Sequence, residues 1–319
     1  MIAEGSYPYI AGGVSSWINQ ILTAFPHIDF TIVSIMPSKK ETIEYKYEIP
    51  ENVVKIRTIY LDDYTKIRHK KVVRQFTFNT EEKREIKKLL RSSPDVHYER
   101  IIHIFNEMKR SGSCIDFLQS KFFFNEIIDL YNEKYSEEVF NMFFWTMRNI
   151  FFPLVYLIQQ KTEEADMYLS ASTGYAGILA TSFAVKNNKG FVLSEHGIYG
   201  REREEELLKA KWVTGIYKKL WIDYFYSISS AAYKRADVVT ALFQANRDIQ
   251  ITLGVDKRKA KLTPNGINYD ALNIEREGHD GINIGSILRI VPIKDSMFCT
   301  IRIYSPQTLC ITKITVHIF

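Results

Sequence analysis

The chain contains few cysteines: only Cys114, Cys299 and Cys310 occur among its 319 residues. Their spacing matches no metal-binding motif, and an odd number of cysteines does not fit a framework of disulfide bonds. Free thiols are typical of proteins in a reducing compartment. The cysteine content therefore predicts a cytoplasmic protein.

The sequence also lacks an N-terminal targeting segment and a long uninterrupted apolar run. No basic region followed by an apolar stretch opens the chain, so we expect no signal peptide. Residues 139–158 are dense in Phe, Met and Trp, but Asn141, Arg148, Asn149 and Pro153 interrupt them. A membrane-spanning helix needs about 20 mostly apolar residues. We therefore interpret this segment as a buried helix, or as two helices kinked near Pro153.

Two further features are absent. The net charge is only +5, and the basic residues lie in segments that also contain glutamate, which argues against nucleic acid as a partner. A basic cluster between Lys66 and Arg74 is interpreted as a solvated loop rather than as a contact surface for anions. The dinucleotide-binding pattern GxGxxG does not occur, which argues against an NAD-dependent oxidoreductase.

Short apolar runs do occur, and they alternate with longer segments of helical periodicity. Apolar residues from Val14 to Leu22 recur on one face of a helix, and those from Ile216 to Ile228 recur every four residues. Strands that alternate with helices predict a parallel sheet covered by helices on both faces, which is a doubly wound α/β domain. The runs expected to be strands are 30–35, 53–61, 167–171, 191–193, 238–242 and 282–288.

Three regions depart from this alternation. Residues 65–160 are mostly helical in pattern and are interpreted as an insertion on the sheet scaffold. The apolar run at the start, Ile2–Ala3, is shorter than the roughly five residues typical of a strand, so we expect the chain to begin inside its first strand. Residues 296–319 contain no Asp, Glu, Gly, Ala or Asn, which predicts a tail foreign to the fold, translated out of frame; the alternative is a genuine terminal pair of strands.

Gly12 and Gly13 precede the first amphipathic helix. Two glycines allow the backbone to approach a ligand closely, and the start of a helix offers free N–H groups to an anion. A tight turn would use the same residues. The pair is therefore a candidate phosphate-binding loop or a turn.

A polar pair, Glu195 and His196, follows the buried strand at 191–193. Ligands bind outside the carboxyl ends of strands in open α/β sheets, so His196 is a candidate functional residue, although a structural role is equally compatible with one histidine. Arg201 and Arg203 follow, and the favoured interpretation is that they pair with glutamates on a helix surface.

Three more segments carry polar or turn-forming residues. Ser172 and Thr173 are expected either to line a cleft or to cap the next helix. The sequence Pro264-Asn265-Gly266 predicts a turn that connects two domains. Arg289 and Lys294 both follow the predicted strand at 282–288. Two cations in this position could bind a pyrophosphate.

Taken in order, these segments resemble the PelF-like glycosyltransferases of family four. The resemblance covers about residues 1–295. It rests on six motifs: EGSYPYIAGGVSSW (4–17), STGYAG (172–177), SEHGIYGRERE (194–204), ALFQANRDIQITLG (241–254), PNGI (264–267) and GSILRIVPIKD (285–295).

The resemblance implies a GT-B fold with two Rossmann-like domains facing across a cleft, the N-terminal domain binding the acceptor and the C-terminal domain binding the sugar nucleotide. The N-terminal domain would comprise residues 1–267, including the helical insertion. Residues 268–295 would form a linker and the first strand of a C-terminal domain that is largely missing. Residues 296–319 would lie outside the family pattern.

The resemblance also implies site residues and chemistry. Gly12 and Gly13 match the loop that approaches the donor phosphates, and His196 matches a histidine near the transferred sugar. Arg289 and Lys294 match the cations that neutralise the departing diphosphate, which is stabilisation of charge that develops in the transition state. The implied reaction retains the anomeric configuration and needs neither a metal nor a cofactor.

Two departures from the family pattern stand in the sequence. Leu169 occupies the position where family members usually have a histidine. No glutamate follows Glu277, so the family's pair of glutamates eight residues apart, which hold the sugar and the ribose, has no counterpart here. We therefore expect this chain to be incomplete and inactive as an enzyme.

The sequence thus predicts a retaining transferase for a UDP-sugar, with UDP-glucose the expected donor and a growing bacterial exopolysaccharide as acceptor. The expected location is the cytoplasm, at the inner face of the membrane, next to a membrane-associated polysaccharide synthesis complex. The alternative is a non-catalytic module that binds the acceptor or a partner, which would have no need of a diphosphate clamp at Arg289 and Lys294.

Overall fold

The computed structural model describes residues 1–39, 44–66, 76–110, 112–267, 269–273, 282–286 and 314–318. They divide into two compact units, Met1–Asn265 and Gly266–Phe319, and each unit has its own sheet.

The first unit is built on a sheet of seven strands, all parallel, in the order β3-β2-β1-β4-β5-β6-β7. A parallel sheet of alternating strands and helices is the α/β architecture that the sequence predicts. The strands are β1 (Ile2–Glu4), β2 (Phe30–Met36), β3 (Val53–Tyr60), β4 (Met167–Ser170), β5 (Gly190–Glu195), β6 (Val238–Ala241) and β7 (Ala260–Leu262).

Helices connect successive strands, except that β3 follows β2 with no helix between them in the described residues. A 3₁₀ helix, η1 (Leu61–Lys66), follows β3, and five α-helices lie between β3 and β4. The α-helices of this unit are α1 (Gly13–Ala24), α2 (Thr80–Leu90), α3 (Tyr98–Met108), α4 (Cys114–Leu118), α5 (Lys121–Lys134), α6 (Phe140–Ile158), α7 (Gly174–Asn187), α8 (Tyr199–Lys209), α9 (Ile216–Arg235) and α10 (Gln244–Thr252).

Both faces of the sheet are buried. Successive side chains of a strand point to opposite faces, and here they enter different apolar clusters. Ala3 and Ile32 belong to the cluster that contains Ile18 of α1, whereas Ile2 and Val33 belong to the larger cluster beneath the other helices. The helices therefore cover the sheet on two sides, as the doubly wound prediction requires.

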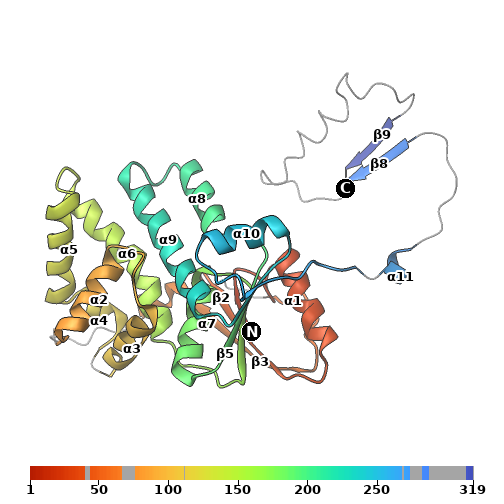
Figure 1. Ribbon diagram of the computed structural model, residues 1–319, viewed down its shortest axis with the longest axis horizontal. Helices are drawn as coiled ribbons and strands as arrows, with labels where there is room; N and C mark the ends of the chain where they lie inside the picture. The colour runs from red at the N-terminus through yellow and green to blue at the C-terminus, as the bar shows by residue number, and fades with distance from the viewer. Residues whose placement is uncertain are drawn as a thin grey trace. The chain divides into compact units, whose positions relative to one another are not determined.

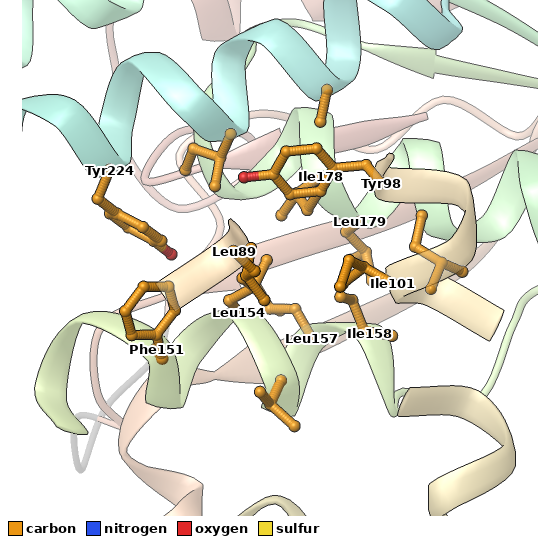
Figure 2. Close-up of a cluster of buried hydrophobic side chains, with 14 of the residues drawn as sticks. Leu89, Tyr98, Ile101, Phe151, Leu154, Leu157, Ile158, Ile178, Leu179 and Tyr224 are labelled. Carbon is orange, nitrogen blue, oxygen red and sulfur yellow. The ribbon is translucent and has the colours of Figure 1, made fainter. Parts of the chain in front are cut away.

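The five helices between β3 and β4 form a helical layer beside the sheet (Figure 1). Side chains from α2, α3, α6, α7 and α9 meet in one buried cluster (Figure 2). In it the ring of Phe151 packs edge-on against Tyr224, with their centroids 5.8 Å apart. This cluster fixes α7 and α9 against the helical layer, and these two helices carry residues of the candidate site.

Local sequence signals account for several boundaries. Asn79 accepts a hydrogen bond from the Glu82 N–H, while the Glu82 carboxylate accepts one from the Asn79 N–H, so a capping box begins α2. A single helix, α6, continues through Pro153, so of the two arrangements expected for residues 139–158 the one-helix arrangement is correct. Among the described residues, no helix combines the length and the apolar character needed to cross a membrane.

The second unit contains α11 (Tyr269–Leu272) and two strands, β8 (Ile282–Ser286) and β9 (Ile314–Ile318). The strands pair in parallel, with Ile282 opposite Ile314 and Ser286 opposite Ile318. The predicted cations Arg289 and Lys294 lie outside the described residues, as does most of the basic cluster at 66–74.

Candidate functional site

The direction in which strands are added to the sheet reverses between β1 and β4. At such a reversal the loops that leave the two strands turn to opposite faces, which opens a crevice at the carboxyl ends of the strands. Glu4 is the last residue of β1, and Ser172 and Thr173 follow β4. His196 follows the neighbouring strand β5. The candidate site is built at this edge.

Glu4 caps the helix that begins on the other side of the reversal. Its carboxylate Oε2 accepts hydrogen bonds from the backbone N–H groups of Tyr175, at 2.7 Å, and Ala176, at 3.2 Å. These are free N–H groups of the first turn of α7, where a negative charge is also favoured by the helix dipole. Burial raises the pKa of the Glu4 carboxyl. The N-terminus of α7 is therefore already occupied by an acid of the protein itself.

Tyr199 connects Glu4 to a second buried acid. Its hydroxyl donates to Glu4 Oε1 at 2.9 Å, and its backbone N–H donates to Glu195 Oε1 at 3.2 Å. The ring lies so close to Gly174 that a Cβ there would be 2.3 Å from the ring's Cζ atom. The absence of a side chain at position 174 thus makes room for the tyrosine that joins the two carboxylates.

Both carboxylate oxygens of Glu195 accept hydrogen bonds from groups inside the protein. Its Oε1 also accepts from the Thr173 hydroxyl at 3.1 Å, and its Oε2 accepts from the Tyr233 hydroxyl at 2.6 Å and the Gln250 amide at 3.0 Å. Burial raises the pKa of this carboxyl. With four donors and no access to solvent, Glu195 holds the turn after β5 in place and is not positioned to contact a ligand.

His196 is the residue that this turn presents. Its ring is half-buried and meets the ring of Trp17 edge-on, with centroids 4.5 Å apart. Its Nε2 atom is buried without a hydrogen-bond partner among the residues that the structure describes. Burial lowers the pKa of His196, so the ring is neutral near pH 7. A neutral imidazole offers one donor and one acceptor to a polar ligand.

Trp17 brings the glycine pair to the same place. Gly12 is the N-cap of α1 and Gly13 its first residue, and Trp17 lies about one turn further along this helix. No side chain caps α1 and no acid lies in its first turn, within the described part of the chain. A Cβ at either glycine would meet nothing within 4 Å. Of the two helices that begin at the reversal, α7 is capped by the carboxylate of Glu4, whereas at the start of α1 the Gly12 N–H donates to the neutral hydroxyl of Tyr47 at 3.4 Å.

Three further positions discussed in the sequence analysis, 173, 203 and 169, differ in their surroundings. Thr173 is the N-cap of α7, but its hydroxyl donates to Glu195 and makes no cap, so the predicted capping role belongs to Glu4 instead. Arg203 pairs with Glu206 at 2.7 Å, as expected for a helix surface, yet its guanidinium also lies 5.0 Å from the centroid of the Tyr199 ring. Leu169, at the position where a histidine would match the family pattern, lies within β4.

An open hollow of about 550 Å³ lies directly beyond His196 along the chain. It is lined by four charged residues and Leu208 of α8, by Asn246 of α10, and by Gly197 and Ile198. No group of three or more potential metal ligands is found within the described ranges. The hollow suits a hydroxylated ligand better than an apolar one, because most of its lining can form hydrogen bonds.

Glu4, Trp17 and Tyr199 were not among the residues that the sequence singled out for function. The rule that drew attention to His196, a polar residue at the end of a strand, applies equally to Glu4. Trp17 follows Gly13 by four residues and so belongs to the first turns of the same helix. Tyr199 carried no signal of its own, since its role depends on contacts with residues far away in the sequence.

Comparison with known proteins adds a family relationship. The profile of one family, described as a domain of unknown function (DUF3492), matches residues 1–258. No curated protein matches the chain at a significant level of sequence similarity. The matched range includes β1, the glycine pair, the helical layer and the turn at His196. Because it covers most of the 319 residues, the chain belongs to the DUF3492 family.

Proposed function

We propose that this chain is the acceptor-side part of a GT-B glycosyltransferase of the PelF type, which transfers a sugar from a UDP-sugar to an exopolysaccharide with retention of configuration. The observation that carries the proposal is the contact between Trp17 and His196. It joins the N-terminus of α1, which has no acid in its first turn, to a neutral histidine at the reversal of a parallel sheet. A sugar nucleotide needs an anion site for its phosphates and, next to it, a hydrogen-bonding group for its sugar.

The anion site is expected at α1. The first N–H groups of a helix and its dipole attract phosphate, and the alternative helix, α7, is closed to anions by Glu4. Absence of a Cβ at Gly12 and Gly13 leaves space for a phosphate to approach the backbone. These facts support a role for the glycine pair in binding the donor.

The sugar is expected at His196. Its buried Nε2 atom can form a hydrogen bond with a hydroxyl of the sugar in either tautomer of the neutral ring. The acceptor is expected in the hollow beyond it, beside α8. In this arrangement the bond from the anomeric carbon to the diphosphate breaks as the bond to the acceptor hydroxyl forms, and the leaving diphosphate takes up the hydroxyl proton.

Arg289 and Lys294 are the cations proposed to stabilise the charge on the leaving diphosphate. We expect binding of the donor to be the property that tests these residues most directly.

The test measures binding of UDP-glucose to the full chain by calorimetry and by saturation-transfer NMR. The variant Gly12→Asp places a carboxylate at the N-cap of α1, which stabilises a helix but repels a phosphate. We expect this variant to unfold at a slightly higher temperature and to bind UDP-glucose more than about tenfold more weakly. Gly12→Asn is the matched control, because it caps the helix without adding charge.

His196→Ala tests the other half of the site. It should remove the saturation transferred to the sugar protons while leaving that of the uridine largely intact. Equal binding by the wild type, Gly12→Asp and His196→Ala would contradict the proposal. A wild-type chain that binds polysaccharide but no sugar nucleotide would favour the non-catalytic binding module instead.

A further inference from the structure

The helices α8 and α9 pack side by side in opposite directions and are joined at one end by a short loop (Figure 1). The residues around this junction, 207–219, form a surface that we call the α8–α9 tip. It lies at the end of α8 remote from His196, and Leu208 is its one residue that also lines the hollow described above.

Buried side chains anchor the tip to the core, and two large apolar side chains of the tip are exposed to solvent. Leu207, Val213 and Tyr217 are buried and fix the loop against the core. Between them, Leu208 is 60% exposed and Trp212 is 75% exposed. Single exposed apolar residues are common, but a tryptophan that an otherwise anchored loop holds out into solvent is not. Trp212 is the most exposed of the four tryptophans of the chain.

Lysines surround these two apolar residues. Lys209, Lys211, Lys218 and Lys219 lie in the tip, and no acidic residue occurs from 207 to 222. The acids that balance this charge lie behind the apex: Lys209 pairs with Glu205 at 2.5 Å, and Lys219 pairs with Asp223 at 2.7 Å. Exposed pairs of this kind contribute little energy, so the lysines remain able to exchange their partners for other anions.

Acidic residues surround the tip, on both of its helices and in a neighbouring loop. Glu138, in the loop between α5 and α6, lies close enough to Tyr217 to act on its ionisation. Glu205, Glu206 and Asp223 lie one turn back from the apex on α8 and α9. The positive charge is thus confined to the apex, together with Leu208 and Trp212.

A bilayer surface fits this combination better than a second protein. Tryptophan prefers the interface between lipid and water, and lysines are attracted to anionic lipid headgroups. A stable protein interface needs roughly 20 to 30 residues from each partner, whereas the tip offers about a dozen. Shallow insertion of two apolar side chains, supported by several cations, is a recognised mode of binding to membranes.

We propose that the α8–α9 tip docks onto an anionic lipid bilayer, with Trp212 and Leu208 inserted among the headgroups and the lysines above the lipid phosphates. The inference goes beyond the proposed function and does not depend on it. Because α8 has eleven residues and rises about 1.5 Å per residue, it separates the tip from the turn at His196 by roughly 16 Å along the helix axis.

The test is sedimentation of the full chain with vesicles of phosphatidylcholine alone and of phosphatidylcholine containing phosphatidylglycerol. We expect binding to the anionic vesicles, at least about tenfold weaker binding to the neutral ones, and weakening by salt. Trp212→Ala and Lys211→Glu should each lower the partition coefficient by about tenfold or more. Trp145→Ala, at an exposed tryptophan of α6, is the matched control and should leave binding unchanged.

Brominated lipids provide a second readout, because they quench a tryptophan only when it reaches the bilayer. Quenching in the wild type that disappears in Trp212→Ala but persists in Trp145→Ala supports the proposal. Failure to bind anionic vesicles at low salt overturns it, as does equal binding to neutral vesicles or equal loss with Trp145→Ala. Capture of a protein partner through the tip without vesicle binding also overturns it.

Discussion

The hydroxyl of Tyr199 donates a hydrogen bond to the carboxylate of Glu4 at 2.9 Å, across 195 residues of sequence. The same carboxylate closes the N-terminus of α7, and the backbone of Tyr199 is held by Glu195. One side chain therefore links the end of β1, the start of α7 and the turn that presents His196. The geometry of the candidate site depends on this link.

Removal of the Tyr199 hydroxyl should destabilise the protein. Tyr199→Phe leaves a buried carboxylate with one donor fewer, and a hydrogen bond to a charged group contributes about 1.5–3 kcal/mol. We expect the free energy of unfolding, measured with urea, to fall by about this amount. Tyr226→Phe removes a similar bond, to Glu204 at 2.7 Å, on a more exposed surface and should cost less than about 1 kcal/mol. Equal losses of unfolding free energy in the two variants would show that the buried hydrogen bond to Glu4 contributes no more than the more exposed one to Glu204.

Two glycines should respond to alanine in opposite ways. A Cβ at Gly174 would lie 2.3 Å from the Tyr199 ring, whereas a Cβ at Gly12 would meet nothing within 4 Å. Overpacking costs about 1–3 kcal/mol, so Gly174→Ala should lower the thermal unfolding temperature clearly. Gly12→Ala, with an extended backbone that any residue adopts, should change the free energy of unfolding by less than about 0.5 kcal/mol. A large loss for Gly12→Ala would show that this loop has a structural role.

His196 should make stability depend on pH near neutrality. Burial lowers its pKa in the folded protein, so the unfolded chain takes up a proton first as the pH falls. The stability contributed by the neutral ring is present above the unfolded pKa of about 6.5 and is lost as the pH falls through the folded pKa. Between about pH 8 and pH 5, the wild type should therefore lose more stability than His196→Asn.

The ring protons of His196, followed by NMR, give a direct check on the same point. They should titrate below the value of a free histidine. A midpoint at or above that of an exposed histidine would contradict the assignment of a neutral, buried ring.

Cys114 should be inert in the folded protein. The residue is buried, and burial raises the pKa of its thiol to about 12. Because the thiolate is the reactive form, maleimide should not label the peptide that contains Cys114 until denaturant is added. Mass spectrometry of the digested protein distinguishes this peptide from those of the other cysteines. Labelling in native buffer at the rate of an unfolded control would show that the helix α4 opens readily.

Residues 1–265 should fold without the second unit. All seven strands of the sheet and both apolar clusters lie within Met1–Asn265. We expect this fragment to be soluble, to retain its helical circular dichroism, and to unfold within about 5 °C of the full chain. A fragment that lacks a cooperative transition would mean that the second unit contributes to the core of the first.

Much of the architecture could be predicted from local patterns. Runs of six and nine residues marked β2 and β3, and four-residue spacing marked α9, because each side chain's exposure follows the period of its own element. The strand β1 has only three residues and gave a weak signal, although it is an interior strand of the sheet, between β2 and β4. Its place depends on pairing with β2 and β4, which no local period encodes.

The candidate site could be predicted only in part. His196 and the glycine pair were found because residues at strand ends and helix starts have predictable surroundings. The contact that joins them, between Trp17 and His196, spans 179 residues and depends on how α1 packs against the sheet. Arg289 and Lys294 lie outside the described residues, so their proposed role comes from the sequence.

The sequence by itself determined which segments form strands and helices, and which polar residues stand at their ends. Only the tertiary structure decided which of two helix N-termini an acid occupies. Thr173 adjoins α7 in sequence, yet Glu4, 171 residues away from Tyr175, caps that helix. The physical reason is that a hydrogen bond depends on proximity in space. The order of strands, with β1 next to β4, brings the carboxylate to α7 and leaves the start of α1 without an acid.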